Sequence, residues 1–163
     1  MFAIRPATAA DAAVLAHHRA GMFRDMGELP DALRDTLEQA ATAYFARAIP
    51  KGRYVAWVAY ARDRPSEIVG GAGLQLRELL PRPHRAQTRL MRGPQALILN
   101  VFTERPWRRR GVAEALMREL LEWCRENGVE SVVLHASNEG RPLYEKLGFT
   151  PTNEMRYDGG VTP

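Results

Sequence analysis

The chain has 163 residues, of which 45% are hydrophobic and 26% are charged. This length and composition are typical of one globular domain and exclude an intrinsically disordered chain. The formal net charge of +4 at pH 7 attracts anions in general, so charge alone does not choose among nucleic acid, acidic proteins and phosphorylated ligands.

Two further features of the sequence argue against a membrane or secreted protein and exclude an internal disulfide. No stretch approaches the ~20 consecutive apolar residues that span a bilayer, and the start MFAIRPATAADAA lacks the apolar core of a secretory signal. Cys124 is the single cysteine, so an internal disulfide is excluded; its spacing from Leu120 predicts a small packing residue rather than a reactive thiol. These features together predict a cytoplasmic protein.

The N-terminal third predicts one strand and two helices. Residues 2–5 form a short apolar start that suits an edge strand. Thr8 and Asp11 have the spacing of a helix-initiating cap, and an alanine-rich helix is expected from there to about Asp25. A second helix is expected from residue 31 to residue 48, with an apolar stripe along one face.

The middle of the chain predicts a hairpin, a loop and a buried strand. YVAWVAYA (residues 54–61) and EIVGGAGLQL (residues 67–76) are typical of two paired strands joined by a turn at residues 63–66. Residues 80–94 contain prolines, arginines and a glycine and predict a loop. ALILNVFT (residues 96–103) is a continuous apolar run, as expected for a central strand buried on both faces.

The last third predicts alternating helices and strands. A helix is expected from near Gly111 to Gly128, a strand over residues 131–136, a short helix over residues 141–146 and a final strand or two within residues 149–157. The resulting order is β-α-α-β-β-β-α-β-α-β. It predicts a mixed α/β fold in a single domain over residues 1–163.

The stretch WRRRGVAEALM (residues 107–117) places three arginines and a glycine where a buried strand leads into a helix. The first N–H groups of a helix lack internal partners, and the helix dipole adds partial positive charge there, so a phosphate fits this position. Gly111 permits close backbone approach, and Ala113 keeps the first turn uncrowded. Arginines oppose the dipole unless an anion compensates them, a conflict typical of functional sites. On this junction alone, a solvated loop with a chance arginine run fits equally well.

Two motifs in order make the interpretation specific. The P-loop and dinucleotide-binding glycine patterns are both absent. RRRGVA (residues 108–113) matches the [Q/R]-x-x-G-x-[G/A] signature of the GNAT superfamily of acyl-CoA-dependent N-acetyltransferases, and SNEGRPLYEKLGF (residues 137–149) resembles that family's second signature. The resemblance covers essentially the whole chain. It implies a GNAT-like fold: a mixed, mostly antiparallel central sheet that splays at the strand 96–103, flanked by about four helices.

The resemblance also implies how the chain binds acetyl-CoA, the acyl donor. Backbone groups of the splayed strand would bind the pantetheine arm and thioester, the start of the next helix would bind the pyrophosphate, and Asn138 would contact the donor. The second motif has one residue fewer than its commonest form between Asn138 and Tyr144, so Arg141 is an alternative ligand for the phosphates. The donor-binding set implied in this way is Val101, Phe102, Thr103, Arg108, Arg109, Arg110, Gly111, Val112, Ala113, Glu114, Asn138 and Arg141.

Acetyl transfer to an amine needs an unprotonated nucleophile, a polarised thioester carbonyl and a proton for the departing thiolate. Backbone N–H groups of the splayed strand can polarise the carbonyl. Tyr144, which the family motif aligns with a tyrosine near the thioester sulfur, is the candidate general acid; without the resemblance it would be a core aromatic. Glu104 follows the central strand and is the first candidate for the base.

Other polar residues are candidates for binding the acceptor amine. Asp25 and Glu28 lie between the first two helices, which line the acceptor pocket in this superfamily, and Asn100 is expected to point into the cleft of the sheet or to be a satisfied polar residue. His17 and His18 are adjacent on a helix, so they are expected to face different directions and to make a poor metal pair. No metal motif is present, and no metal is expected.

The sequence thus predicts an acetyl-CoA-dependent N-acetyltransferase that acts on a primary amine of a small molecule or peptide. Two alternatives are a non-catalytic module that senses acyl-CoA and a nucleic-acid-binding protein that uses the arginine clusters; the latter lacks aromatic residues interleaved with the arginines. No nucleic-acid or membrane partner is expected, and a homodimer is a common arrangement in similar proteins. The acceptor stays open, because residues 22–30 offer acidic groups whereas residues 77–94 are strongly basic.

Overall fold

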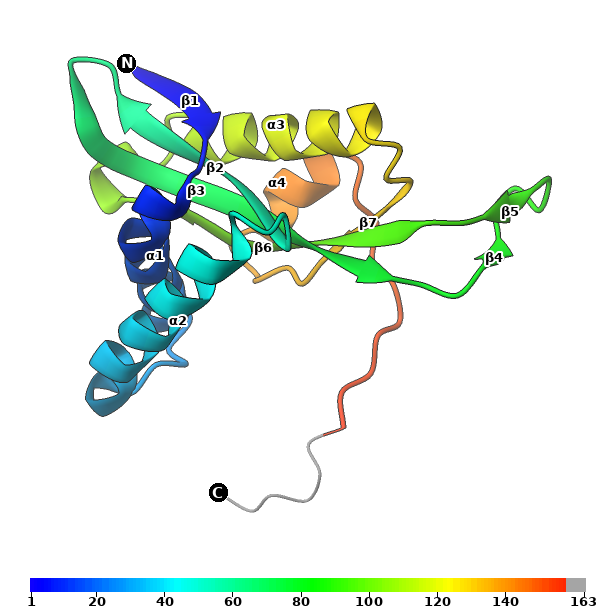
Figure 1. Cartoon of the computed structure of the whole chain (residues 1–163), viewed down its shortest axis with the longest axis horizontal. Coiled ribbons are helices and arrows are strands. Elements are labelled where there is room, and N and C mark those ends of the chain that lie inside the picture. Colours follow the sequence, from blue (N-terminus) through cyan, green and yellow to red (C-terminus); the bar gives the residue numbers. More distant parts are fainter. Residues whose placement is uncertain (158–163) are drawn as a thin grey trace.

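A computed structural model describes residues 1–157, and it is built around one five-stranded sheet (Figure 1). The strand order is β1-β2-β3-β6-β7. The strands are β1 (Phe2–Pro6), β2 (Tyr54–Ala61), β3 (Arg64–Glu78), β6 (Pro94–Thr103) and β7 (Ser131–Leu134), and the α-helices are α1 (Ala12–Asp25), α2 (Arg34–Ala48), α3 (Val112–Glu126) and α4 (Arg141–Lys146). A mixed α/β fold with four such helices in the described residues confirms the predicted fold class.

The sheet is antiparallel except at one pair of strands. β1, β2, β3 and β6 pair antiparallel in sequence, whereas β6 and β7 run parallel. The parallel pairing requires a crossover between the two strands, and α3 provides it. β6 is therefore a central strand with a helix that begins just beyond its C-terminal end.

Helices cover both faces of the sheet and bury two separate clusters. Alternate residues of β2 illustrate the division: Tyr54, Ala56 and Val58 pack with α1 and α2, whereas Trp57 and Ala59 pack with α3. Alternation of this kind follows from the two-residue period of a strand. Cys124 of α3 is buried in the cluster that contains Trp57 and Ala59. Burial raises the pKa of its thiol to about 11, in agreement with its predicted packing role.

A narrow arm extends from the body of the molecule between β3 and β6 (Figure 1). Residues 80–94 were expected to form a loop, but they contain a two-stranded hairpin of β4 (Arg82–Pro83) and β5 (Leu90–Met91). Each strand has only two residues, too few to produce a recognisable alternation in the sequence.

The predicted final strand within residues 149–157 is wrong. This segment contains no regular secondary structure and its side chains are mostly exposed, including those of Met155 and Tyr157. Pro151 lacks the N–H that a strand needs for pairing, and β7 pairs with β6 alone among the described strands.

The predicted cap at Thr8 and Asp11 is confirmed. The Thr8 hydroxyl accepts a hydrogen bond from the N–H of Ala10, and the Asp11 carboxylate accepts one from the N–H of Thr8. Arg5 of β1 adds a bidentate ion pair to Asp11, with distances of 2.8 and 2.9 Å. The pair thereby connects the edge strand to the start of α1.

We expect Asp11→Asn to lower the free energy of unfolding by roughly 1–3 kcal/mol at pH 7, the typical effect of losing hydrogen bonds to a charged group. The Arg5 guanidinium and, to a lesser extent, the hydrogen bonds from Thr8 hold the pKa of Asp11 below its ordinary value. This contribution is therefore present above the unfolded-state pKa and is lost as the pH falls through the folded-state value. Denaturant titrations at pH 7 and pH 3 test this: the difference in the free energy of unfolding between the wild type and the variant should be smaller at pH 3 than at pH 7.

Candidate active site

The C-terminal half of β6 has an open edge. Its pairing with β7 ends at the pair Ile98–Leu134, although β6 continues to Thr103. On its other side β6 remains paired with β3 as far as Gly70–Thr103. The backbone of Val101, Phe102 and Thr103 consequently has no neighbouring strand on the β7 side within the described residues. This is the splay that the sequence resemblance implied, and its free N–H and C=O groups are available to an extended ligand.

A bulge lies within this open segment. Gly71 pairs with Phe102 and Gly73 with Leu99, so β6 has one residue more than β3 over this interval. Asn100 adopts the left-handed conformation, with φ of 61°, which asparagine tolerates better than most residues. Its buried amide donates to the carbonyl oxygen of Leu15 at 3.0 Å. Asn100 thus contacts α1 directly, and its role toward an acceptor stays a prediction.

The turn between β6 and α3 presents consecutive backbone N–H groups. Arg109 has φ of 60° and Gly111 has φ of 81°. Within the described residues, Ala115 is the first residue of this helix start with an internal acceptor, the carbonyl oxygen of Gly111, and no acceptor is found for the N–H groups of residues 109–114. A Cβ placed on Gly111 would meet no atom within 4 Å, so the space above it is open. These observations fit a bound diphosphate.

The three arginines before Gly111 have different surroundings. Arg108 donates to the carbonyl oxygen of Thr103 at 3.0 Å and pairs with Asp25 at the end of α1. Arg110 lies over the Trp107 ring at 5.4 Å. Arg109 is exposed. The Arg108 guanidinium is therefore held by the protein itself, and phosphate contacts by all three arginines stay a prediction.

Tyr144 lies on α4, against the cluster formed by α3 and the sheet. Its ring packs edge-on against Phe149, with the centroids 6.1 Å apart, and passes close to Gly140, where a Cβ would come within 2.8 Å of the ring. Burial raises the pKa of the Tyr144 hydroxyl above its ordinary value. The phenol therefore stays protonated at neutral pH, as a proton donor must.

An ion pair at the end of α4 connects this helix to the first turn of α3. Lys146 of α4 forms an ion pair with Glu114 of α3 at 2.7 Å, and hydrogen bonds from Lys146 and Arg118 lower the pKa of the Glu114 carboxyl. Asn138 and Arg141 are exposed near the beginning of α4. Glu114 can offer a phosphate only its backbone N–H, because its carboxylate is itself an anion and accepts hydrogen bonds from Arg118 and Lys146.

Glu104 lies on the opposite face of the sheet, where α1 approaches β6. A Cβ on Gly21 would come within 2.8 Å of the Phe102 ring, so glycine permits this close approach. The Glu104 carboxylate is one-third exposed and lies 3.6 Å from the Nε2 atoms of both His17 and His18. His18 is buried and His17 is partly exposed, yet the rings of both approach Glu104. The prediction that the two histidines face different directions did not include this shared contact. No local pattern could have indicated this contact, because Glu104 is 86 positions from His18.

The two segments proposed to bind the acceptor lie at opposite ends of β6. Asp25, in residues 22–30, pairs with Arg105 and Arg108 beside Thr103; burial raises its pKa, but the hydrogen bonds from these arginines outweigh it, and the pKa is lowered. Glu28 is exposed in the same segment. The basic segment, residues 77–94, instead contacts the start of β7: Arg82 donates to Ser131, and Arg89 pairs with Glu130.

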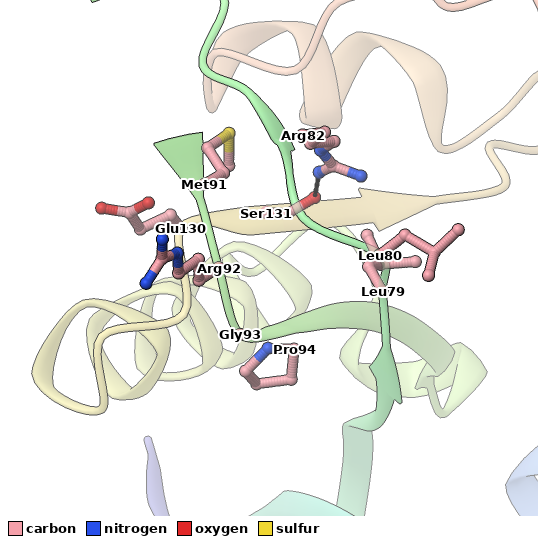
Figure 2. A pocket seen from close by; sticks show the side chains of 9 residues that line it. All are labelled: Leu79, Leu80, Arg82, Met91, Arg92, Gly93, Pro94, Glu130 and Ser131. Atoms are coloured by element: carbon pink, nitrogen blue, oxygen red, sulfur yellow. Dashed lines mark hydrogen bonds between the residues drawn. The ribbon is translucent and has the colours of Figure 1, made fainter. Parts of the chain in front are cut away.

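A pocket at the base of the arm belongs to this distant end (Figure 2). It is lined by residues of the arm together with Glu130 and Ser131. Ser131 pairs with Gln95 at the beginning of β6. Thr103 is eight positions further along the strand, or about 26 Å at the ordinary rise per residue. This pocket is therefore separate from the open edge of β6 and the start of α3.

The described residues hold no group of three or more His, Cys, Asp or Glu side chains arranged for a metal ion. Among the same residues, no helix has both the length and the apolar composition needed to cross a membrane.

An open central strand that leads into a helix start with free N–H groups is the arrangement that the resemblance to acyl-CoA-dependent transferases implied, and comparisons with known proteins identify the family. The sequence model of the Acetyltransferase (GNAT) family matches residues 18–149. The chain belongs to this acetyltransferase family, which confirms the family expected from the two motifs.

Solved structures and a curated relative agree with this assignment. A GCN5-related N-acetyltransferase from Ralstonia eutropha is 27% identical, with a TM-score of 0.81 and coverage of 96% of this chain and 97% of that one. A predicted acetyltransferase from Clostridium acetobutylicum, solved with acetyl-CoA, is 25% identical, with a TM-score of 0.78 and coverage of 96% and 95%. A glucosamine 6-phosphate N-acetyltransferase from Trypanosoma brucei brucei is 34% identical over 102 residues, which are 61% of this chain and 63% of that protein.

Proposed function

We propose that the protein transfers an acetyl group from acetyl-CoA to a primary amine of a small molecule or peptide. The observation that carries this proposal is the position of the open edge of β6 between two helical layers. Glu104 faces the α1 layer, whereas Tyr144 packs in the α3 layer. A strand with a candidate base on one face and a candidate acid on the other suits a direct transfer between an amine and a thioester.

In this proposal the chain binds the donor through backbone groups. The N–H groups of residues 109–114 bind the diphosphate, and the open edge at residues 101–103 binds the pantetheine arm and polarises the thioester carbonyl. When acetyl-CoA is bound, it supplies the activated acetyl group. Gly111 and Ala113 leave room for the diphosphate, and Arg109 adds positive charge nearby.

The proton transfers follow from the two side chains. Glu104 takes a proton from the ammonium form of the acceptor, which then attacks as a neutral amine. The new C–N bond forms as the C–S bond breaks, and Tyr144 gives its proton to the departing thiolate. The second proton lost by the nitrogen restores Tyr144, so the overall reaction releases one proton.

In this proposal the acceptor binds near the acidic segment, residues 22–30, rather than near the basic segment, residues 77–94. Residues 22–30 lie at the end of β6 where the thioester would lie and carry the exposed Glu28, while Asp25 in the same segment already pairs with Arg105 and Arg108. Residues 77–94 contact the other end of that strand. We therefore propose a cationic amine as the acceptor. The name of the trypanosomal relative makes glucosamine 6-phosphate the principal competing acceptor.

A thiol-release assay with acetyl-CoA tests the proposed function. Polyamines, aminoglycosides, lysine-containing peptides and glucosamine 6-phosphate are compared at equal concentration, and products are identified by mass spectrometry. We expect an acetylated amine product and the highest kcat/KM with a polycationic acceptor. Preference for glucosamine 6-phosphate would contradict the cationic acceptor, and acetyl-CoA binding without turnover of any amine would contradict the transfer itself.

A further inference from the structure

We propose that His17 carries the acceptor's proton from Glu104 to solvent, an inference that rests on the proposed function. Glu104 must release the proton of each turnover before it can act again. Its carboxylate is only one-third exposed and faces two imidazoles. In the proposed function the acceptor occupies the exposed side of this carboxylate, so direct exchange with water would compete with it. A second route through the protein removes this competition.

The position of His17 suits this route. Its Nε2 lies 3.6 Å from Oε1 of Glu104, and its Nδ1 lies 3.5 Å from Oε1 of Glu38 on α2. The two ring nitrogens thus face carboxylates from two different elements, and 43% of the side chain is exposed to solvent. A movement of about half an ångström brings either pair within hydrogen-bond length.

An imidazole in this position passes a proton without leaving its place. One nitrogen of neutral imidazole accepts a proton, and the other then releases one. Protonated Glu104 gives its proton to Nε2 of His17, and the Nδ1 proton goes to water or to Glu38. Glu104 returns to the carboxylate and His17 to the neutral imidazole of the other tautomer. A ring flip or the reverse exchange with water restores the first tautomer, and no atom is gained or lost.

His18 does not offer the same route. It is fully buried, and neither ring nitrogen has a hydrogen-bond partner within residues 1–157. Burial, with a smaller effect from His17, lowers its pKa to about 4, so it stays neutral at pH 7. Its Nε2 faces Glu104, and its ring lies against the Phe102 ring and near Gly71 and the His17 ring. A proton placed on His18 would have no path outward.

The remaining charged groups around His17 support the direction of transfer. Glu38 is also paired with Arg34, whose Nε lies 3.3 Å from the same oxygen that faces His17. His18, Glu104 and Glu38 are the titratable groups that face His17 from α1, from the end of β6 and from α2. A carboxylate thus faces each ring nitrogen of His17, and the exposed side of the ring contacts solvent.

The test uses His17→Gln in the full chain, with thiol release measured in weakly buffered solution. We expect kcat to fall about tenfold while the KM values for acetyl-CoA and amine stay within about twofold, a smaller loss than the roughly 100-fold or more that removal of the general base itself brings. Added imidazole should restore kcat in the variant and leave the wild type unchanged, because a soluble base replaces the missing proton carrier. His17→Asn provides a second variant of the same kind if His17→Gln folds poorly.

A double-mutant cycle with Glu104→Gln supplies the matched control. If His17 acts through Glu104, the double variant has the same kcat as Glu104→Gln alone, since no proton reaches His17 without the carboxylate. Additive losses, or a loss in His17→Gln that imidazole does not restore, would overturn the relay and indicate a structural role. If the relay fails in this way while the wild type still acetylates an amine, the proposed function stands. If the wild type turns over no amine, the proposed function and the relay are both rejected.

Discussion

Tyr144→Phe should lower kcat by about 100-fold or more, the range expected when a general acid is lost. The affinity for acetyl-CoA should change little, because the hydroxyl leaves and the ring stays. Tyr144 packs through its ring against Phe149 and Gly140, so the phenylalanine ring fits the same space. Steady-state kinetics and calorimetric binding of acetyl-CoA measure the two quantities separately.

Tyr60→Phe is the matched control for this substitution. Tyr60 lies on β2, pairs with Ala3 of the edge strand and is half-buried, so the change removes the same hydroxyl from a position outside the site. We expect its kcat to remain within about twofold of the wild-type value, as surface changes away from special features have small effects. Equal activity of Tyr144→Phe and the wild type would exclude Tyr144 as the acid.

Gly111→Val should weaken acetyl-CoA binding about tenfold or more, the equivalent of one lost charge-assisted hydrogen bond. The added side chain projects into the open space above the free N–H groups of residues 109–114, where the diphosphate would bind. Because Gly111 has φ of 81°, the substitution also strains the backbone. Affinity must therefore be separated from stability, and calorimetry below the melting temperature of the variant does this.

Gly128 provides the corresponding control at the other end of α3. It has φ of 66°, and a Cβ placed on it likewise meets no atom within 4 Å. Gly128→Val should cost a similar free energy of folding, about 1–3 kcal/mol for a strained non-glycine residue. Its affinity for acetyl-CoA should match that of the wild type. A folded Gly111→Val variant with unchanged affinity would contradict the proposed diphosphate site.

The sequence predicted the fold well where local patterns are strong. The apolar run that ends at Thr103, the amphipathic helix after Gly111 and the cap at Thr8 each carry their signal within a few residues, and all three are present. The hairpin of β4 and β5 lacked such a signal because its strands are only two residues long. The final strand was wrong because apolar residues near Tyr157 have no neighbouring strand to pair with.

Only part of the site could be predicted in the same way. The free N–H groups before Ala115 follow from a glycine at a helix start, which is a local property. The bulge at Asn100, the pairing of Asp25 with Arg108 and the approach of two histidines to Glu104 depend on how α1 packs across β6. Long-range packing of this kind leaves no period or motif in the sequence, so these contacts emerged only from the structure.

In the proposed function, the two faces of the sheet serve different substrates: the acceptor on the α1 side and the donor on the α3 side. The donor would bind to the open backbone edge of β6, the turn after it and the start of α3, whereas the residues that would meet the acceptor belong to α1, the segment after it and Glu104. The ion pairs of Asp25 with Arg105 and Arg108 connect the two sides. Under the proposed function, we expect substitutions in α1 away from Asp25 to change the amine that is accepted and to leave donor binding unchanged.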